Sequence, residues 1–118
     1  MKIRIKHNSV RYRLTQSDVA ALAKEKKLSD SVDFGLQQFI YELQVVDDYA
    51  LSSTFSNNTI TIYIPQKMVT ELVETDKTGF EDERHLPHLL VEKDFVCLDD
   101  VAEDQADNYP NPSAAKKI

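Results

Sequence analysis

Two short segments near the start of the chain alternate apolar and charged residues with a period of two. They span residues 2–6 and 10–14, and in each the apolar side chains fall on one face and the cations on the other. Such alternation is typical of half-buried β-strands. Because His7-Asn8-Ser9 between them can turn the chain, the pattern predicts an N-terminal hairpin with Tyr12 pointing inward.

After residue 14 the apolar spacing changes from two to three or four. Apolar residues recur at helical intervals from Val19 to Ala23. The Thr15 hydroxyl can cap a helix, and Asp18 lies near the positive end of its dipole. A helix is therefore predicted from about Gln16 to Lys26.

A strand is predicted over residues 39–45, which are rich in aromatic and β-branched side chains, and it completes the first half. The second half repeats this succession, with strands predicted over 51–55 and 59–64 around the turn at Asn57-Asn58. Pro65 ends the last of these and suits the first turn of a helix. The helix that follows, over about 66–74, has a predicted buried stripe of Met68, Val69, Leu72 and Val73. Further strand material is predicted at 79–81 and 89–95, with Pro87 between the two.

Displacing the sequence by fifty positions makes the symmetry explicit. Asn8 then aligns with Asn58, and the turn, the switch from strand to helix and the helix stripe all coincide. We interpret this as an internal duplication. The predicted fold class is α+β, a strand-rich barrel or sandwich of two pseudo-repeated ββαβ units, mainly antiparallel and with two short helices. The further identities are Gln16 with Gln66, Val19 with Val69 and Leu22 with Leu72.

Size and composition favour one globular domain. The chain has 118 residues, of which 42% are apolar and 29% charged. The predicted domain covers residues 1–98, with pseudo-repeats at about 1–48 and 49–98. Residues 99–118 form an acidic, Pro-containing C-terminal tail, expected to be a solvated strap or flexible. No segment approaches the roughly 20 apolar residues of a membrane span, and Cys97 is alone, so we expect a cytoplasmic protein without a membrane partner.

The net charge of −6 conceals a strong asymmetry. Residues 1–27 hold eight cations against only Asp18 and Glu25. Such a region could bind nucleic acid through phosphate contacts, or it could attract the acidic remainder within one fold or between two chains. The candidate nucleic-acid-binding residues are Lys2, Arg4, Lys6, Arg11 and Arg13.

Two resemblances accompany these patterns. Residues 57–66, with the helix after them and Gly79-Phe80-Glu81, resemble the swapped-hairpin unit of AbrB-type and MazE-type bacterial regulators. The first half is similar, although His7 and Thr15 stand where that family carries Gly and Pro. This resemblance implies nucleic-acid binding by basic residues near the strands, with both units held in one chain.

Over its whole length the chain resembles an uncharacterised bacterial family, a domain of unknown function. The resemblance is carried by residues 1–6, 57–61, 91–95 with Cys97-Leu98, and the C-terminal EDQxDNYPNP motif over 103–112. It implies no activity, cofactor or catalytic residue.

Metal-binding chemistry has few candidate ligands. His85, His88 and Cys97 lie near many carboxylates, and zinc accepts N, S and O ligands. Pro87 excludes a helical arrangement of the two histidines, and exposed loop histidines with a buried thiol are the commoner outcome. We therefore assign no metal ligand and expect no cofactor. The acidic residues of the tail, which lack the spacing of an EF-hand, are Asp99, Asp100, Glu103, Asp104 and Asp107.

The sequence lacks the common catalytic motifs. There is no Gly-x-Ser-x-Gly elbow, and Gly35 and Gly79 are too far apart for a phosphate-binding loop. We assign no catalytic residue. By elimination the sequence predicts a non-enzymatic interaction or accessory module, acting on an unknown protein partner or by self-association, through exposed strand edges or the tail. The alternatives are an AbrB-like nucleic-acid-binding regulator, a small enzyme and a metal-binding protein.

Overall fold

The computed structural model describes residues 1–96 and 106–111. Within them the element order ββαββ occurs twice, so the predicted α+β class with two short helices is confirmed. The elements are β1 (Lys2–Lys6), β2 (Ser9–Leu14), α1 (Gln16–Glu25), β3 (Lys27–Asp33), β4 (Gln38–Val46), β5 (Ser52–Ser56), β6 (Thr59–Pro65), α2 (Gln66–Glu74), β7 (Gly79–Asp82) and β8 (His88–Lys93).

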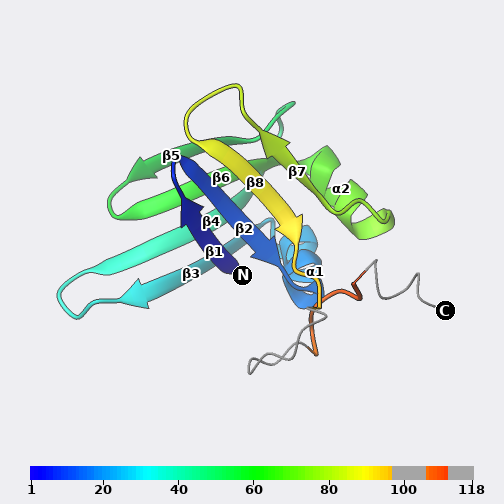
Figure 1. The fold of residues 1–118 in the computed structure, drawn as a ribbon, viewed down its shortest axis with the longest axis horizontal. Coiled ribbons are helices and arrows are strands. Elements are labelled where there is room, and N and C mark those ends of the chain that lie inside the picture. Colours follow the sequence, from blue (N-terminus) through cyan, green and yellow to red (C-terminus); the bar gives the residue numbers. More distant parts are fainter. Residues whose placement is uncertain (97–105, 112–118) are drawn as a thin grey trace.

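The strands form two separate four-stranded sheets, in the orders β1-β2-β8-β7 (sheet A) and β3-β4-β6-β5 (sheet B). The first hairpin of the chain thus pairs with the last, and the two middle hairpins pair with each other (Figure 1). The central pairs β2–β8 and β4–β6 are parallel, whereas the four hairpin pairs are antiparallel. In the described part of the chain the sheets do not close into a barrel, so the sandwich is the alternative that fits.

One strand was absent from the prediction. β3 (Lys27–Asp33) lies in a segment to which the sequence analysis assigned no element. It is an edge strand that is mostly exposed and pairs only with β4. Leu28 and Val32 share one face of this strand, but Asp30 stands between them on that face, so the unbroken alternation of a half-buried strand is missing.

Residue pairing in the hairpins recurs at a displacement of fifty positions. Lys2 lies opposite Arg13 in β1 and β2, and Ser52 lies opposite Tyr63 in β5 and β6. The same holds for the other two hairpins. Side chains at positions fifty apart therefore occupy matching places in the two sheets.

The two parallel ladders differ by two residues. Ser9 lies opposite His88, whereas Thr59 lies opposite Ile40 and not opposite residue 38. Since side chains alternate with a period of two, this shift leaves every side chain on its own face.

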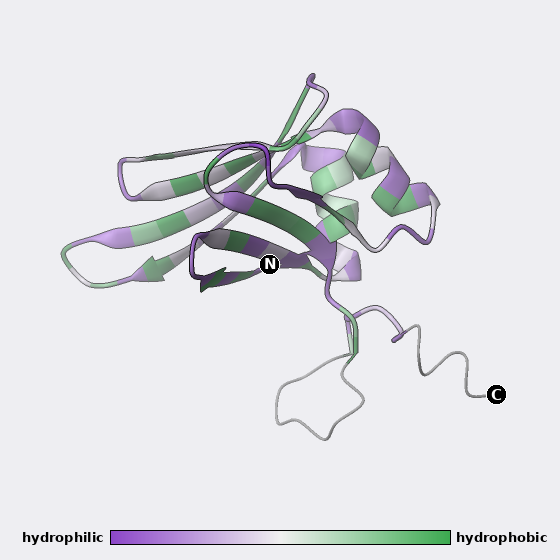
Figure 2. Ribbon diagram, turned by 45° about the horizontal axis from the view of Figure 1, so that its top comes forward, coloured by the Kyte–Doolittle hydropathy of each residue, from purple (hydrophilic) through white to green (hydrophobic). Residues whose placement is uncertain are grey.

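The hydrophobic core of the described residues lies between the sheets and the two helices. In Figure 2, hydrophobic and hydrophilic stretches follow one another along the strands. Tyr12 is completely buried, as predicted, and its hydroxyl donates to the Ile60 carbonyl of the other sheet at 3.1 Å. This bond ties the sheets together across the core. The buried apolar residues are Val10, Tyr12, Leu14, Val19, Leu22, Leu43, Leu51, Ile62, Ile64, Val69, Leu72, Leu89 and Val91.

Both helices lie close to where they were predicted. Thr15 and Asp18 form a reciprocal capping box at the start of α1. In α2, Val69 and Leu72 are buried, but Val73 is exposed, contrary to the predicted stripe. This short helix lies at the surface and buries only a narrow face. Neither helix of the described chain has the length and apolarity that a membrane crossing requires.

Part of the predicted tail lies against the body. Phe95 forms a β-bridge with Tyr109, and the Lys93 ammonium lies 4.9 Å from the centre of the Tyr109 ring. Gln16 donates its backbone N–H to the Asp107 carbonyl at 3.1 Å. Residues 106–111 are therefore a docked strap; the rest of the predicted tail lies outside the described residues.

Candidate functional site

An open groove of about 630 Å³ lies between the two sheets. It lies at the ends of β2 and β6 opposite those that lead into the helices. Its volume is within the usual range of ligand pockets, roughly 300–1,000 Å³. Five segments form it: the β1–β2 hairpin, the β5–β6 hairpin, the start of β4, the β7–β8 loop and the start of β8.

Apolar side chains dominate the groove, and several are unusually exposed. Ile5, Phe55 and Leu86 keep 58%, 72% and 83% of their surface accessible. Contiguous exposed apolar surface on a small protein marks an interaction site more often than scattered single residues do. The polar groups beside it come from His7, Asn8, Ser9, Ser53 and Thr54.

Both halves of the chain contribute to the groove in a matched way, which the sequence analysis did not foresee. Its facing apolar residues occur as pairs fifty positions apart, because the sheets that carry them are related by that displacement. The pairs are Ile5 with Phe55, Val10 with Ile60 and Phe39 with Leu89.

All five predicted nucleic-acid-binding cations lie on the outer face of β1 and β2. Arg11 and Arg13 place Nε at 3.2 and 3.5 Å from the Glu92 carboxylate on β8. Lys2 Nζ lies 3.1 Å from the buried Asp94 carboxylate. Arg4 and Lys6 have no ion pair among the described residues. The basic face therefore exists, and three of its five charges are engaged within the fold.

The fold itself does not require cations on this face. At the matching positions of sheet B every one of the five is replaced by an uncharged side chain with a hydroxyl group. These counterparts are Ser52, Thr54, Ser56, Thr61 and Tyr63. The same strand geometry thus accommodates a neutral outer face.

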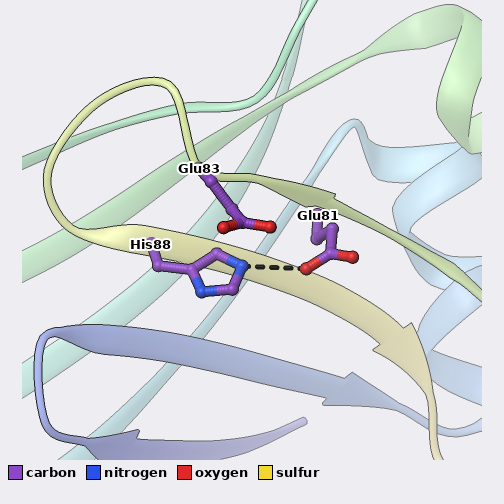
Figure 3. A group of neighbouring side chains, drawn as sticks. All are labelled: Glu81, Glu83 and His88. Atoms are coloured by element: carbon purple, nitrogen blue, oxygen red, sulfur yellow. Dashed lines mark hydrogen bonds and ion pairs between the residues drawn. The ribbon is translucent and has the colours of Figure 1, made fainter.

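A cluster of possible metal ligands lies at the other edge of sheet A (Figure 3). Glu81 on β7, Glu83 in the loop after it and His88 on β8 bring one ligand atom each within 4.8 Å of one another. His88 Nε2 lies 2.9 Å from Glu81 Oε2. Imidazole nitrogen with carboxylate oxygens is a donor set that zinc and related cations accept.

This cluster differs from the one considered on sequence. His88 is a member, but His85 is not, and Cys97 lies outside the described residues. Glu81 and Glu83 were not singled out. Their spacing of two, which puts them on one face of an extended segment, was the available signal, but only the β7–β8 pairing brings His88 to them.

A second, more polar cavity of about 470 Å³ lies where the strap meets the body. Three buried polar residues line it: Lys93, Asp94 and Asn108. Burial lowers the pKa of Lys93, whose ammonium donates to the Thr75 carbonyl at 3.1 Å. Because Lys93 also contacts the Tyr109 ring, we assign this region to holding the strap.

Taken together, the fold and the groove define a small two-sheet α+β protein with an open apolar groove between the sheets. The model of a family of unknown function, DUF7009, matches residues 1–113, and the chain belongs to this family. No curated protein and no solved structure matches it. The predicted membership of an uncharacterised family is thereby confirmed, while the AbrB-type resemblance stays a prediction.

Proposed function

We propose that this protein is a non-enzymatic interaction module that recognises an apolar protein surface in the groove between its sheets. The observation that carries the proposal is the exposure of Ile5, Phe55 and Leu86 around one cavity. Covering them with apolar partner atoms would contribute about 25 cal/mol per Å² removed from water. The adjoining polar groups would fix the orientation of the partner.

A fluorescent apolar probe, such as 1-anilinonaphthalene-8-sulfonate, tests whether the groove is accessible. We expect the folded protein to enhance its fluorescence, and Phe55→Ser to reduce that enhancement several-fold. Tyr49→Ser is the matched control, because Tyr49 is equally aromatic and 97% exposed but lies outside the groove. If Phe55→Ser and Tyr49→Ser enhance the probe fluorescence equally, the groove is excluded as the probe's binding site.

We also infer that the two ββαββ halves arose by internal duplication. The matched hairpin pairing at fifty positions and the paired lining of the groove support this inference. On this view the groove formed where two copies of one unit came together, and the outer faces of the sheets acquired different charges afterwards.

A second candidate function is binding of a divalent metal ion. The observation that favours it is the approach of Glu81, Glu83 and His88 to one another on an exposed face. Two carboxylates held so close repel each other, and a divalent cation would relieve that repulsion. An ion pair between Glu81 and His88 without any metal is the competing interpretation.

A further inference from the structure

The turn between β3 and β4 presents two apolar side chains to solvent. Phe34 is 71% exposed and Leu36 fully exposed. The turn is fixed by two hydrogen bonds: Gly35 N–H donates to Asp33 Oδ1 and Phe34 N–H donates to the Gln37 carbonyl, both at 2.8 Å. Gly35 has φ of 88°, a conformation that favours glycine. Residues 34–36, which we name the apolar tip, are thus held in place before any partner arrives.

The counterpart of this tip lies in the groove. Leu86, fifty positions after Leu36, lines the cavity from the β7–β8 loop. Leu36 instead lies on a longer hairpin that projects from the body (Figure 1). One chain therefore carries both an apolar protrusion and an apolar cavity.

We propose that the groove receives the apolar tip of a second copy of this chain. The inference rests on the proposed function, because it names the occupant of the same groove. A pre-ordered tip loses little conformational freedom on binding, and Phe34 and Leu36 are the kind of anchors that fill apolar pockets.

Charge supports a second copy as the partner. Lys6, exposed beside the groove residues Ile5 and His7, has no ion pair among the described residues. The exposed Asp33 flanks the tip. Insertion of the tip would bring these opposite charges toward each other, which accelerates association and makes it sensitive to salt.

The size of the contact predicts weak association. A phenylalanine buries roughly 150–250 Å², so one tip in one groove falls short of the roughly 1,000 Å² expected of a stable interface. Reciprocal insertion would double the contact and give a twofold dimer, whereas one-way insertion would give an open chain of copies. We expect an association that grows with protein concentration.

Sedimentation velocity over a hundredfold range of concentration tests the inference. The wild-type chain should shift to larger species at high concentration, while Leu36→Asp and Phe55→Ser should each remain monomeric. Tyr49→Asp, a change of similar character outside the groove and the tip, should behave as wild type. Circular dichroism of each variant checks that it keeps the wild-type secondary structure.

The decisive arm mixes the two defective variants. Leu36→Asp retains an intact groove and Phe55→Ser an intact tip, so at the highest concentrations their mixture should recover, through one tip-in-groove contact, part of the association that neither variant shows alone. A wild-type chain that stays monomeric throughout, or a mixture without complex, overturns the second-copy inference. If the second-copy inference fails but the wild type still binds the fluorescent probe and Phe55→Ser does not, the proposed function stands.

Discussion

Ser17 donates two hydrogen bonds to the Asp107 carboxylate, from its backbone N–H at 3.3 Å and from its hydroxyl at 3.0 Å. The two residues lie ninety positions apart in the sequence. The carboxylate thereby meets the first turn of α1, where the helix dipole favours negative charge. This contact joins the strap to the same helix start that Thr15 caps.

The contact between the strap and α1 should make the stability of the fold depend on pH in the acidic range. Hydrogen bonds from Thr15 and Ser17 lower the pKa of the Asp107 carboxyl. Its stabilising contribution is therefore present above the pKa of the unfolded chain, about 4, and is lost as the pH falls below it. We expect the urea midpoint of the wild type to fall over this range, and that of Asp107→Asn to start lower and to fall less. Identical profiles for both proteins would contradict the assigned contact.

Alkali should destabilise the fold through Tyr12. Burial raises the pKa of its phenol, which donates to the Ile60 carbonyl. In the unfolded chain the phenol ionises near pH 10, so the free energy of unfolding should decrease as the pH rises above that value. Tyr12→Phe should weaken this dependence. It should also lower stability at pH 7 by about 1 kcal/mol, the usual net contribution of one hydrogen bond.

Burial also raises the pKa of Tyr41 and Tyr109, so some alkaline sensitivity should survive in the Tyr12→Phe variant. Equilibrium urea unfolding at pH 7, 9, 10 and 11 measures the difference. An unchanged slope above pH 10 in Tyr12→Phe would show that Tyr12 ionises normally in the folded state.

Zinc titration tests the cluster at the edge of sheet A. If Glu81, Glu83 and His88 hold a cation, calorimetry should show one ion bound per chain. His88→Ala should weaken zinc binding at least tenfold, because the two carboxylates that remain, Glu81 and Glu83, hold zinc poorly without the imidazole. His85→Ala is the control, because that histidine lies in the neighbouring β7–β8 loop but outside the cluster. Equal losses in both variants would indicate nonspecific histidine binding.

The sequence predicts local structure well and long-range pairing poorly in this protein. The capping residues Thr15 and Asp18 and the period of two in residues 10–14 are local signals, and both elements lie where they predict. The parallel pairing of β2 with β8 joins residues nearly eighty positions apart, and no local pattern specifies it. The groove depends on that pairing, so it could not be assembled from the sequence. The ligand cluster depends instead on the register of the β7–β8 hairpin, which brings His88 to Glu81 and Glu83.

The basic face can be tested by replacing residues with their own counterparts. Arg4→Thr with Lys6→Ser installs the residues found at positions 54 and 56, where sheet B accommodates them at matching places. The double variant should therefore fold, with a stability close to that of the wild type. It removes the two cations of this face that have no ion pair among the described residues.

Arg4 and Lys6 could serve either nucleic-acid binding or self-association, and the double variant should lose a different one in each case. If they contact phosphates, the wild type should retain DNA or RNA in a gel shift at low salt, and the variant should bind more weakly, with the slope of log K against log salt smaller by about two. If they steer a second copy, nucleic acid should not bind, and self-association should weaken mainly at low ionic strength. Because salt screens the attraction between the opposite charges, wild type and variant should sediment alike in 0.5 M salt. A difference that persists at this salt concentration would mean that the substitutions disturb the β1–β2 hairpin itself.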